Sequence, residues 1–109
     1  MTMRTERIKC LNDNLRRNLQ GGRAVITLGV AALGEEEVAR IVQTISIYDD
    51  FCHANDPYGE HDFGSFQAGG QLIYFKIDYY DRTMTAHSPD PSDPTVTARV
   101  ITIMLASEY

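Results

Sequence analysis

Three histidines and a run of acidic residues are the side chains of this 109-residue chain best suited to chemistry. The segment "NDPYGEHDFG", residues 55–64, holds one of these histidines and three acids. Imidazole nitrogens and carboxylate oxygens are suitable ligands for zinc or iron. One hypothesis is therefore a metal-dependent enzyme that uses the His/Asp/Glu cluster around residues 53–62 together with His87. Its candidate ligands and acid–base groups are His53, Glu60, His61 and His87.

The spacing of these residues matches no recognised metal-binding pattern. The chain contains no HExxH, no CxxC and no EF-hand pattern of alternating acids followed by a distal Glu. His61 and Asp62 are adjacent, so they point to opposite faces if they open a strand. The metal-dependent enzyme is therefore the second hypothesis, and we predict no metal ion and no other cofactor.

Other catalytic patterns are equally weak. Cys52 and His53 are neighbours in sequence, which does not make a catalytic pair, and no GxSxG motif is present. The segment "GGRAVITLGV" lacks the GxGxxG spacing and the P-loop lysine of phosphate-binding loops. Acid–base catalysis by carboxyl groups would require Asp49 and Asp50 to lie close to Asp78 and Asp81. It would also require burial, which raises the pKa of a carboxyl group. The sequence therefore predicts no catalytic residue.

Charge is distributed unevenly along the chain, whose formal net charge is −5. No Lys or Arg occurs from residue 41 to residue 75. Between residues 49 and 93 there are nine acids but only two bases, Lys76 and Arg82. Such a negative region repels phosphate backbones and attracts basic surfaces. We therefore expect no direct binding of nucleic acid, and a partner protein with a basic surface.

The acidic region also carries aromatic side chains, which are common in protein interfaces. Tyr58 lies among the acids of residues 55–64 and is a candidate for exposure. We expect the partner-binding surface to consist of exposed loop residues. They are Asp49, Asp50, Asp56, Tyr58, Glu60 and Asp62.

The chain carries no signal for a membrane or for secretion. Its longest apolar candidate, "VITLGVAAL", is well short of the roughly 18 residues that cross a bilayer. The N-terminal "MTMRTERIKC" has no apolar segment of the kind found in secretory signals. The only two cysteines, Cys10 and Cys52, suggest reduced thiols rather than a disulfide framework. We therefore expect a cytoplasmic protein without a membrane partner.

We expect a single domain that covers residues 1–109 and positions the candidate site residues. The first segment has an apolar stripe typical of a helix that ends before Gly21, with Arg16 and Arg17 expected to face water. "RAVITL" (23–28) suits a buried strand, and residues 34–51 form a second helix. Asp49 and Asp50 would then lie unfavourably near the C-terminus of that helix.

The second half predicts a β-hairpin followed by a third helix. "DFGSFQ" and "QLIYFKIDYY" flank "AGG", and alternation in the second strand places Ile73, Phe75 and Ile77 on one face. The last segment, residues 95–109, is rich in β-branched residues, yet Asp93 followed by Pro94 resembles a helix start. We favour a helix there. The expected fold is α+β, ordered helix-strand-helix-hairpin-helix, with an antiparallel sheet packed against helices.

Several segments resemble one uncharacterised bacterial family. They are "LNDNLRR", "GGRAVITLGVAAL", "GEHDFG", "KIDYYD" and "DPTVTARVITIMLASEY". The family is a domain of unknown function common in alphaproteobacterial chromosomes and plasmids. The resemblance implies no established activity or catalytic residue. It implies a context, since such genes often lie on mobile elements beside antirestriction-type genes.

Charge, aromatic content and this context together favour a small acidic, non-catalytic protein-binding module. One specific form of this hypothesis is an inhibitor of a nucleic-acid-handling defence system, of the anti-CRISPR or anti-restriction type, that acts through the acidic surface. The oligomeric state is not predicted.

Overall fold

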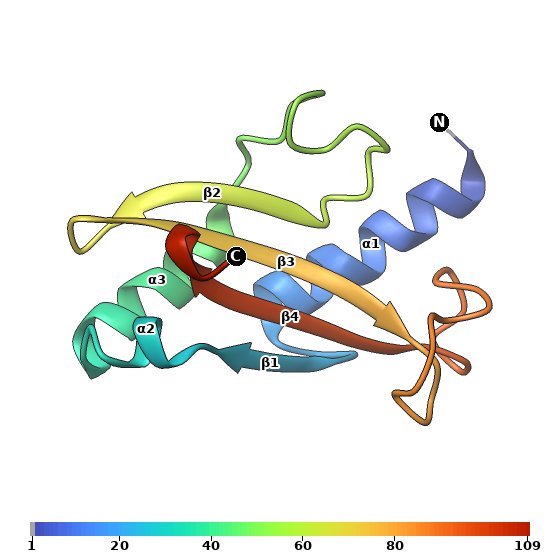
Figure 1. Ribbon diagram of the computed structural model, residues 1–109. Helices are drawn as coiled ribbons and strands as arrows, with labels where there is room; N and C mark the ends of the chain where they lie inside the picture. Colours follow the sequence, from blue (N-terminus) through green and yellow to red (C-terminus); the bar gives the residue numbers. More distant parts are fainter. Residues whose placement is uncertain (1) are drawn as a thin grey trace.

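Helices cover one face of a four-stranded sheet in the computed structural model, which describes residues 2–109 (Figure 1). The helices are α1 (Met3–Asn18), α2 (Leu28–Ala31), α3 (Glu35–Ile47) and the short 3-10 helix η1 (Ala106–Glu108). The strands are β1 (Arg23–Ile26), β2 (Phe63–Ala68), β3 (Gln71–Tyr80) and β4 (Ala98–Leu105). Helices α1 and α3 lie behind the sheet in Figure 1, and η1 lies in front of it. The α+β prediction is confirmed.

The ends of α1 and α3 are set by local residues. Thr2 caps α1 through its hydroxyl, which accepts a hydrogen bond from the Thr5 amide at 3.0 Å. The helix ends at Asn18, and the following C-cap residue Leu19 adopts a left-handed conformation with φ of 54°. Helix α3 ends at Ile47, so Asp49 and Asp50 lie outside it and the expected conflict with the helix dipole does not arise.

The hairpin of β2 and β3 forms as predicted. Gly69 and Gly70 make the turn between paired Ala68 and Gln71, and both have positive φ, which a tight hairpin turn requires. Ile73, Phe75 and Ile77 are all at most 4% exposed and face the helices. The alternation of β3 therefore identified the buried face of the sheet.

The predicted C-terminal helix is wrong, because the segment forms β4, one of the two inner strands of the sheet. Asp93 and Pro94 belong to a turn instead: the Asp93 carboxylate accepts hydrogen bonds from the amide and hydroxyl of Thr95. Strand β4 pairs with β3 on one side and β1 on the other. Its run of β-branched residues suits a strand buried on both faces, and this outweighs the local helix-start signal.

The sheet is mixed rather than purely antiparallel, and β1 is not buried as expected. Strand β1 runs parallel to β4, with Arg23 opposite Val100, whereas the other two pairings are antiparallel. All four residues of β1 are exposed, because the strand lies at the edge of the sheet. Its β-branched residues reflect strand geometry rather than burial.

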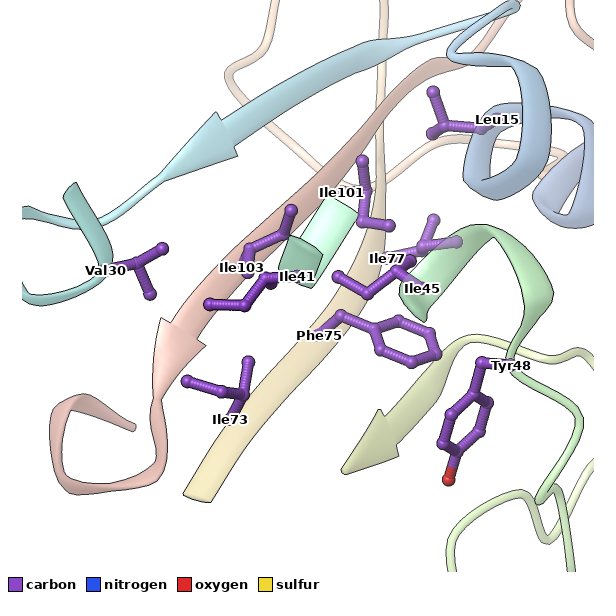
Figure 2. Packing of buried hydrophobic residues seen from close by; sticks show 10 residues of the cluster. All are labelled: Leu15, Val30, Ile41, Ile45, Tyr48, Ile73, Phe75, Ile77, Ile101 and Ile103. Atoms are coloured by element: carbon purple, nitrogen blue, oxygen red, sulfur yellow. The ribbon is translucent and has the colours of Figure 1, made fainter. Parts of the chain in front are cut away.

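The core lies between the sheet and helices α1, α2 and α3 (Figure 2). Its buried members are Leu15, Val30, Ile41, Ile45, Tyr48, Ile73, Phe75, Ile77, Ile101 and Ile103. The Phe75 and Tyr48 rings meet edge to face at 5.1 Å between centroids. Gly64 is opposite Phe75, and a Cβ there would lie 2.5 Å from the Phe75 ring. Within residues 2–109, no helix combines the length and apolar character needed to span a membrane.

Candidate functional site

The segment between α3 and β2, residues 48–62, is ordered by Asp56. One carboxylate oxygen of Asp56 accepts hydrogen bonds from the amides of Glu60 at 2.9 Å and His61 at 3.1 Å. Asp56 is only 8% exposed, so the expectation that it is an exposed loop residue is wrong. Its carboxylate instead fixes the turn that presents Glu60.

His61 attaches this segment to helix α1. Its Nδ1 lies 2.9 Å from Oδ1 of Asp13, and its ring stacks on Phe51 with centroids 3.9 Å apart. The backbone of His61 is left-handed, with φ of 58°, which is uncommon for a residue other than glycine. Strand β2 starts only at Phe63, so the alternation expected for His61 and Asp62 does not apply.

Arg16 continues this network into the interior. It was expected to face water but is 1% exposed. Its guanidinium donates hydrogen bonds to the carbonyls of Ile45 and Tyr48 and to the Asp13 carboxylate, each at 2.8 Å. Burial opposes ionisation of Asp13, but hydrogen bonds from Arg16 and His61 outweigh it and lower the pKa of that carboxyl. Asp13 and Arg16, both on α1, therefore join this helix to the end of α3 and to the 48–62 segment.

A second network orients Glu60. The Tyr79 hydroxyl donates to Oε1 of Glu60 at 2.8 Å and accepts from the Asn12 amide group at 2.8 Å. Asn12 also donates to the Glu60 carbonyl at 3.0 Å and accepts from Arg99 Nε at 2.7 Å. Burial raises the pKa of Tyr79, which keeps its hydroxyl protonated as a donor. The Glu60 carboxylate is thus held in place by a strand and a helix.

The carboxylates of Glu60 and Asp62 line an open groove of about 500 Å³ between the 48–62 segment and the chain that links β3 to β4. Its lining residues are Arg4, Ile8, Tyr58, Glu60, Asp62, Tyr79, His87, Ser88, Pro89 and Pro91. We call this the acidic groove. Within residues 2–109, neither Glu60 nor Asp62 forms an ion pair with a Lys or Arg side chain. Arg4, on the groove wall, pairs instead with Asp90 at 3.3 Å.

Asp62 has an unfavourable environment for a charged carboxylate. Burial, with a contribution from the nearby Glu60 charge, raises its pKa from 3.8 to about 6. It also lines an adjoining pocket of about 440 Å³ that shares Tyr79 and His87 with the acidic groove. At neutral pH the groove therefore holds negative charge that is not ion-paired with any Lys or Arg side chain among residues 2–109.

This pKa shift predicts that Asp62 destabilises the folded state at neutral pH. Because the folded pKa is raised, the contribution of the protonated Asp62 to stability is complete below about pH 4 and is lost as pH rises through about 6. Asp62→Asn should therefore be more stable than the parent protein at pH 7, and the difference should disappear near pH 4. Urea denaturation at the two pH values measures this. Equal stability at pH 7 would contradict the assigned environment.

The six predicted partner-binding residues are not brought together as one surface. Tyr58, Glu60 and Asp62 line the acidic groove, with the Tyr58 side chain 75% exposed. Asp49 and Asp50 are exposed beyond the end of α3 and do not line the groove. Asp56 supports the groove from beneath by fixing the Glu60 backbone.

The residues of the metal-enzyme hypothesis line two different pockets. His53 and His61 line a pocket of about 460 Å³ together with Cys52 and Asp56. Glu60 and His87 line the acidic groove. Across residues 2–109, no three His, Cys, Asp or Glu side chains are grouped so that they could hold a metal ion.

The sequence reasoning missed the buried polar residues that build the site: Asn12, Arg16, Tyr79 as a hydrogen-bond donor, and Arg99. A signal was present for two of them. Asn12 and Arg16 follow Ile8 at four-residue steps and so lie on its buried face of α1. Arg99 alternates with Ile101 and Ile103, a pattern that is visible only once the segment is assigned as a strand.

Comparison with known proteins identifies the class of protein but no activity. Residues 26–108 match the model of a family described as a protein of unknown function, DUF3768. The chain therefore belongs to this family. No curated protein and no solved structure matches it.

Proposed function

We propose that this protein is a non-catalytic protein-binding module, and that its acidic groove receives a basic side chain from a partner protein. One observation carries the proposal: Glu60 and Asp62 line the same open groove, and no Lys or Arg among residues 2–109 pairs with either of them. A lysine or arginine of a partner supplies the cation for an ion pair with these carboxylates.

The groove walls add apolar contact to this charge. Tyr58 projects from the 48–62 segment, while the exposed Pro89 forms an apolar part of the wall. An exposed tyrosine at the edge of an acidic site can pack on the aliphatic stem of a lysine or stack on a guanidinium. Tyr58 is accordingly the anchor residue of the proposed interface.

The raised pKa of Asp62 supports a binding role. A carboxylate whose charged form destabilises the folded state gives the fold no benefit at neutral pH. Functional sites are where proteins retain such groups. A bound cation would relieve the repulsion between Asp62 and Glu60. Binding of the partner would therefore also stabilise the folded module.

The partner class we propose is a nucleic-acid-handling defence complex in the cytoplasm, of the CRISPR or restriction type. Proteins of this class present basic grooves to phosphate backbones, which an acidic surface can occupy. Support comes from the net charge of −5 and from the context that the resemblance implies, alphaproteobacterial mobile elements beside antirestriction-type genes. The same charge makes direct binding of duplex DNA unfavourable.

The test is affinity capture from the native host, comparing two variants that remove equal charge. Glu60→Gln/Asp62→Asn alters the acidic groove, whereas Asp49→Asn/Asp50→Asn alters exposed carboxylates outside it. We expect the first variant to lose a basic partner identified by mass spectrometry, and the second to retain it. Capture of the same partner by both variants, or direct binding of the wild-type protein to duplex DNA at physiological salt, would overturn the proposal.

The alternative, a metal-dependent enzyme, predicts that added zinc raises the melting temperature. A ligand stabilises a protein only by binding its native state. Since no three His, Cys, Asp or Glu side chains among residues 2–109 are grouped to hold a metal ion, we expect added zinc to leave the melting temperature unchanged. Elemental analysis that finds one metal per chain, lost in His61→Ala, would favour the enzyme instead.

A further inference from the structure

A pocket of opposite character lies where strands β1 and β4 begin. It has a volume of about 320 Å³. Its lining residues are Gly21, Gly22, Arg23, Arg82, Met84, Thr97, Ala98, Arg99 and Val100. None of these is acidic, although the chain as a whole carries a net charge of −5. We call it the arginine pocket.

The positive charge of this pocket comes from Arg23 and Arg82. Among residues 2–109, neither guanidinium forms an ion pair. Arg82 makes only a long hydrogen bond, 3.5 Å, to the Thr97 carbonyl. The adjacent Asp81 is occupied by the turn that follows it, where its carboxylate accepts from Thr83 and Thr85. Both guanidiniums are therefore available to a ligand.

Arg99 lines the pocket without adding a free charge. Its Nε donates to Asn12 on α1 and its Nη2 donates to the Pro91 carbonyl. These partners lie on the helix-covered face of the sheet, which Arg99 shares with Ile101 and Ile103 by strand alternation. The carbonyl of Arg99 instead faces Gly22, where an added Cβ would lie 2.5 Å from it.

Two backbone amides complete the set of donors. The N–H groups of Gly21 and Gly22 donate no backbone hydrogen bond to another described residue. Gly21 has a φ of 81°, and Gly22 cannot carry a side chain without meeting Arg99 and Leu15. Both glycines line the pocket, and neither places a side chain in it. These two amides and two guanidiniums that form no ion pair are the donors available to an oxyanion in this pocket.

We propose that the arginine pocket binds a phosphate group, which Arg23 and Arg82 clamp and the amides of Gly21 and Gly22 orient. Guanidinium groups match the geometry of phosphate oxygens and bind them through paired hydrogen bonds. The group belongs to free phosphate or to a small phosphate monoester, since both present the same oxygens. This site is independent of the acidic groove and does not rest on the proposed protein partner.

The test follows backbone amide signals by NMR while inorganic phosphate or O-phosphoserine is added at constant ionic strength. We expect saturable shifts at Gly21, Gly22, Arg23 and Thr97. Tighter binding of inorganic phosphate assigns the site to the free anion, and tighter binding of O-phosphoserine assigns it to a monoester.

Two double variants with equal loss of charge make the test specific. Arg23→Gln/Arg82→Gln should weaken binding by at least about tenfold, because each guanidinium contributes charge-assisted hydrogen bonds. Arg7→Gln/Arg17→Gln removes two exposed arginines that do not line the pocket and should leave the affinity unchanged. Shifts that rise linearly without saturation, or an equal loss in both variants, would overturn the site.

Discussion

Replacing Phe75 by Ala is expected to lower the free energy of unfolding by about 3–5 kcal/mol, the usual cost of removing a buried phenylalanine. Phe75 is fully buried at the centre of the core and contacts Tyr48 edge to face (Figure 2). The change removes this contact and leaves a cavity between the hairpin and α3. A loss of this size is enough to unfold a small domain of ordinary stability.

The neighbouring Lys76 provides the control for this prediction. It lies on the opposite face of β3, is partly exposed and pairs with Asp78 at 3.1 Å. Lys76→Ala should change the stability by less than about 1 kcal/mol, as exposed ion pairs generally do. Urea denaturation measures both variants, and similar losses at the two positions would mean that the faces of β3 are wrongly assigned.

Replacing Arg16 by Ala is expected to have an effect of similar size, about 3–5 kcal/mol, because it removes the fully buried guanidinium from a partly buried ion pair. The change leaves the Asp13 carboxylate without its closest cation and leaves the carbonyls of Ile45 and Tyr48 without a donor. It also loosens the connection between α1 and the 48–62 segment that carries Glu60. Stability and partner binding should therefore fall together.

The matched control is Arg17→Ala, which removes the same charge from the next residue of α1. Arg17 is exposed and forms no ion pair among residues 2–109, so its replacement should alter the stability by less than about 0.5 kcal/mol. The unfolding free energies from urea denaturation give both values. An Arg16→Ala variant as stable as Arg17→Ala would show that the buried network contributes little.

Local patterns were enough to predict the hairpin and its buried face. The two glycines of the turn and the alternation through Ile73, Phe75 and Ile77 are both features of a short stretch of chain. The C-terminal strand was missed for the converse reason. Asp93 and Pro94 give a local helix signal, whereas the pairing of β4 with β1 and β3 depends on segments far away in sequence.

The candidate site was predictable in composition but not in geometry. The sequence alone located Tyr58, Glu60 and Asp62 in one acidic segment, and all three line the acidic groove. It could not show that Asp56 is buried, because a carboxylate that caps two amides has the same sequence context as one in water. Nor could it show that Tyr79, on a distant strand, fixes the Glu60 side chain.

A binding titration tests most directly the central claim that the acidic groove receives a basic side chain. A short peptide rich in arginine and lysine should shift the backbone amide signals of Tyr58, Glu60, Asp62 and Tyr79 in an NMR titration, and added salt should weaken its binding. Glu60→Gln/Asp62→Asn should abolish these shifts, while Asp49→Asn/Asp50→Asn should preserve them. Shifts centred on Asp49 and Asp50, or unaffected by the groove variant, would contradict the assignment of the acidic groove as the site for a basic partner.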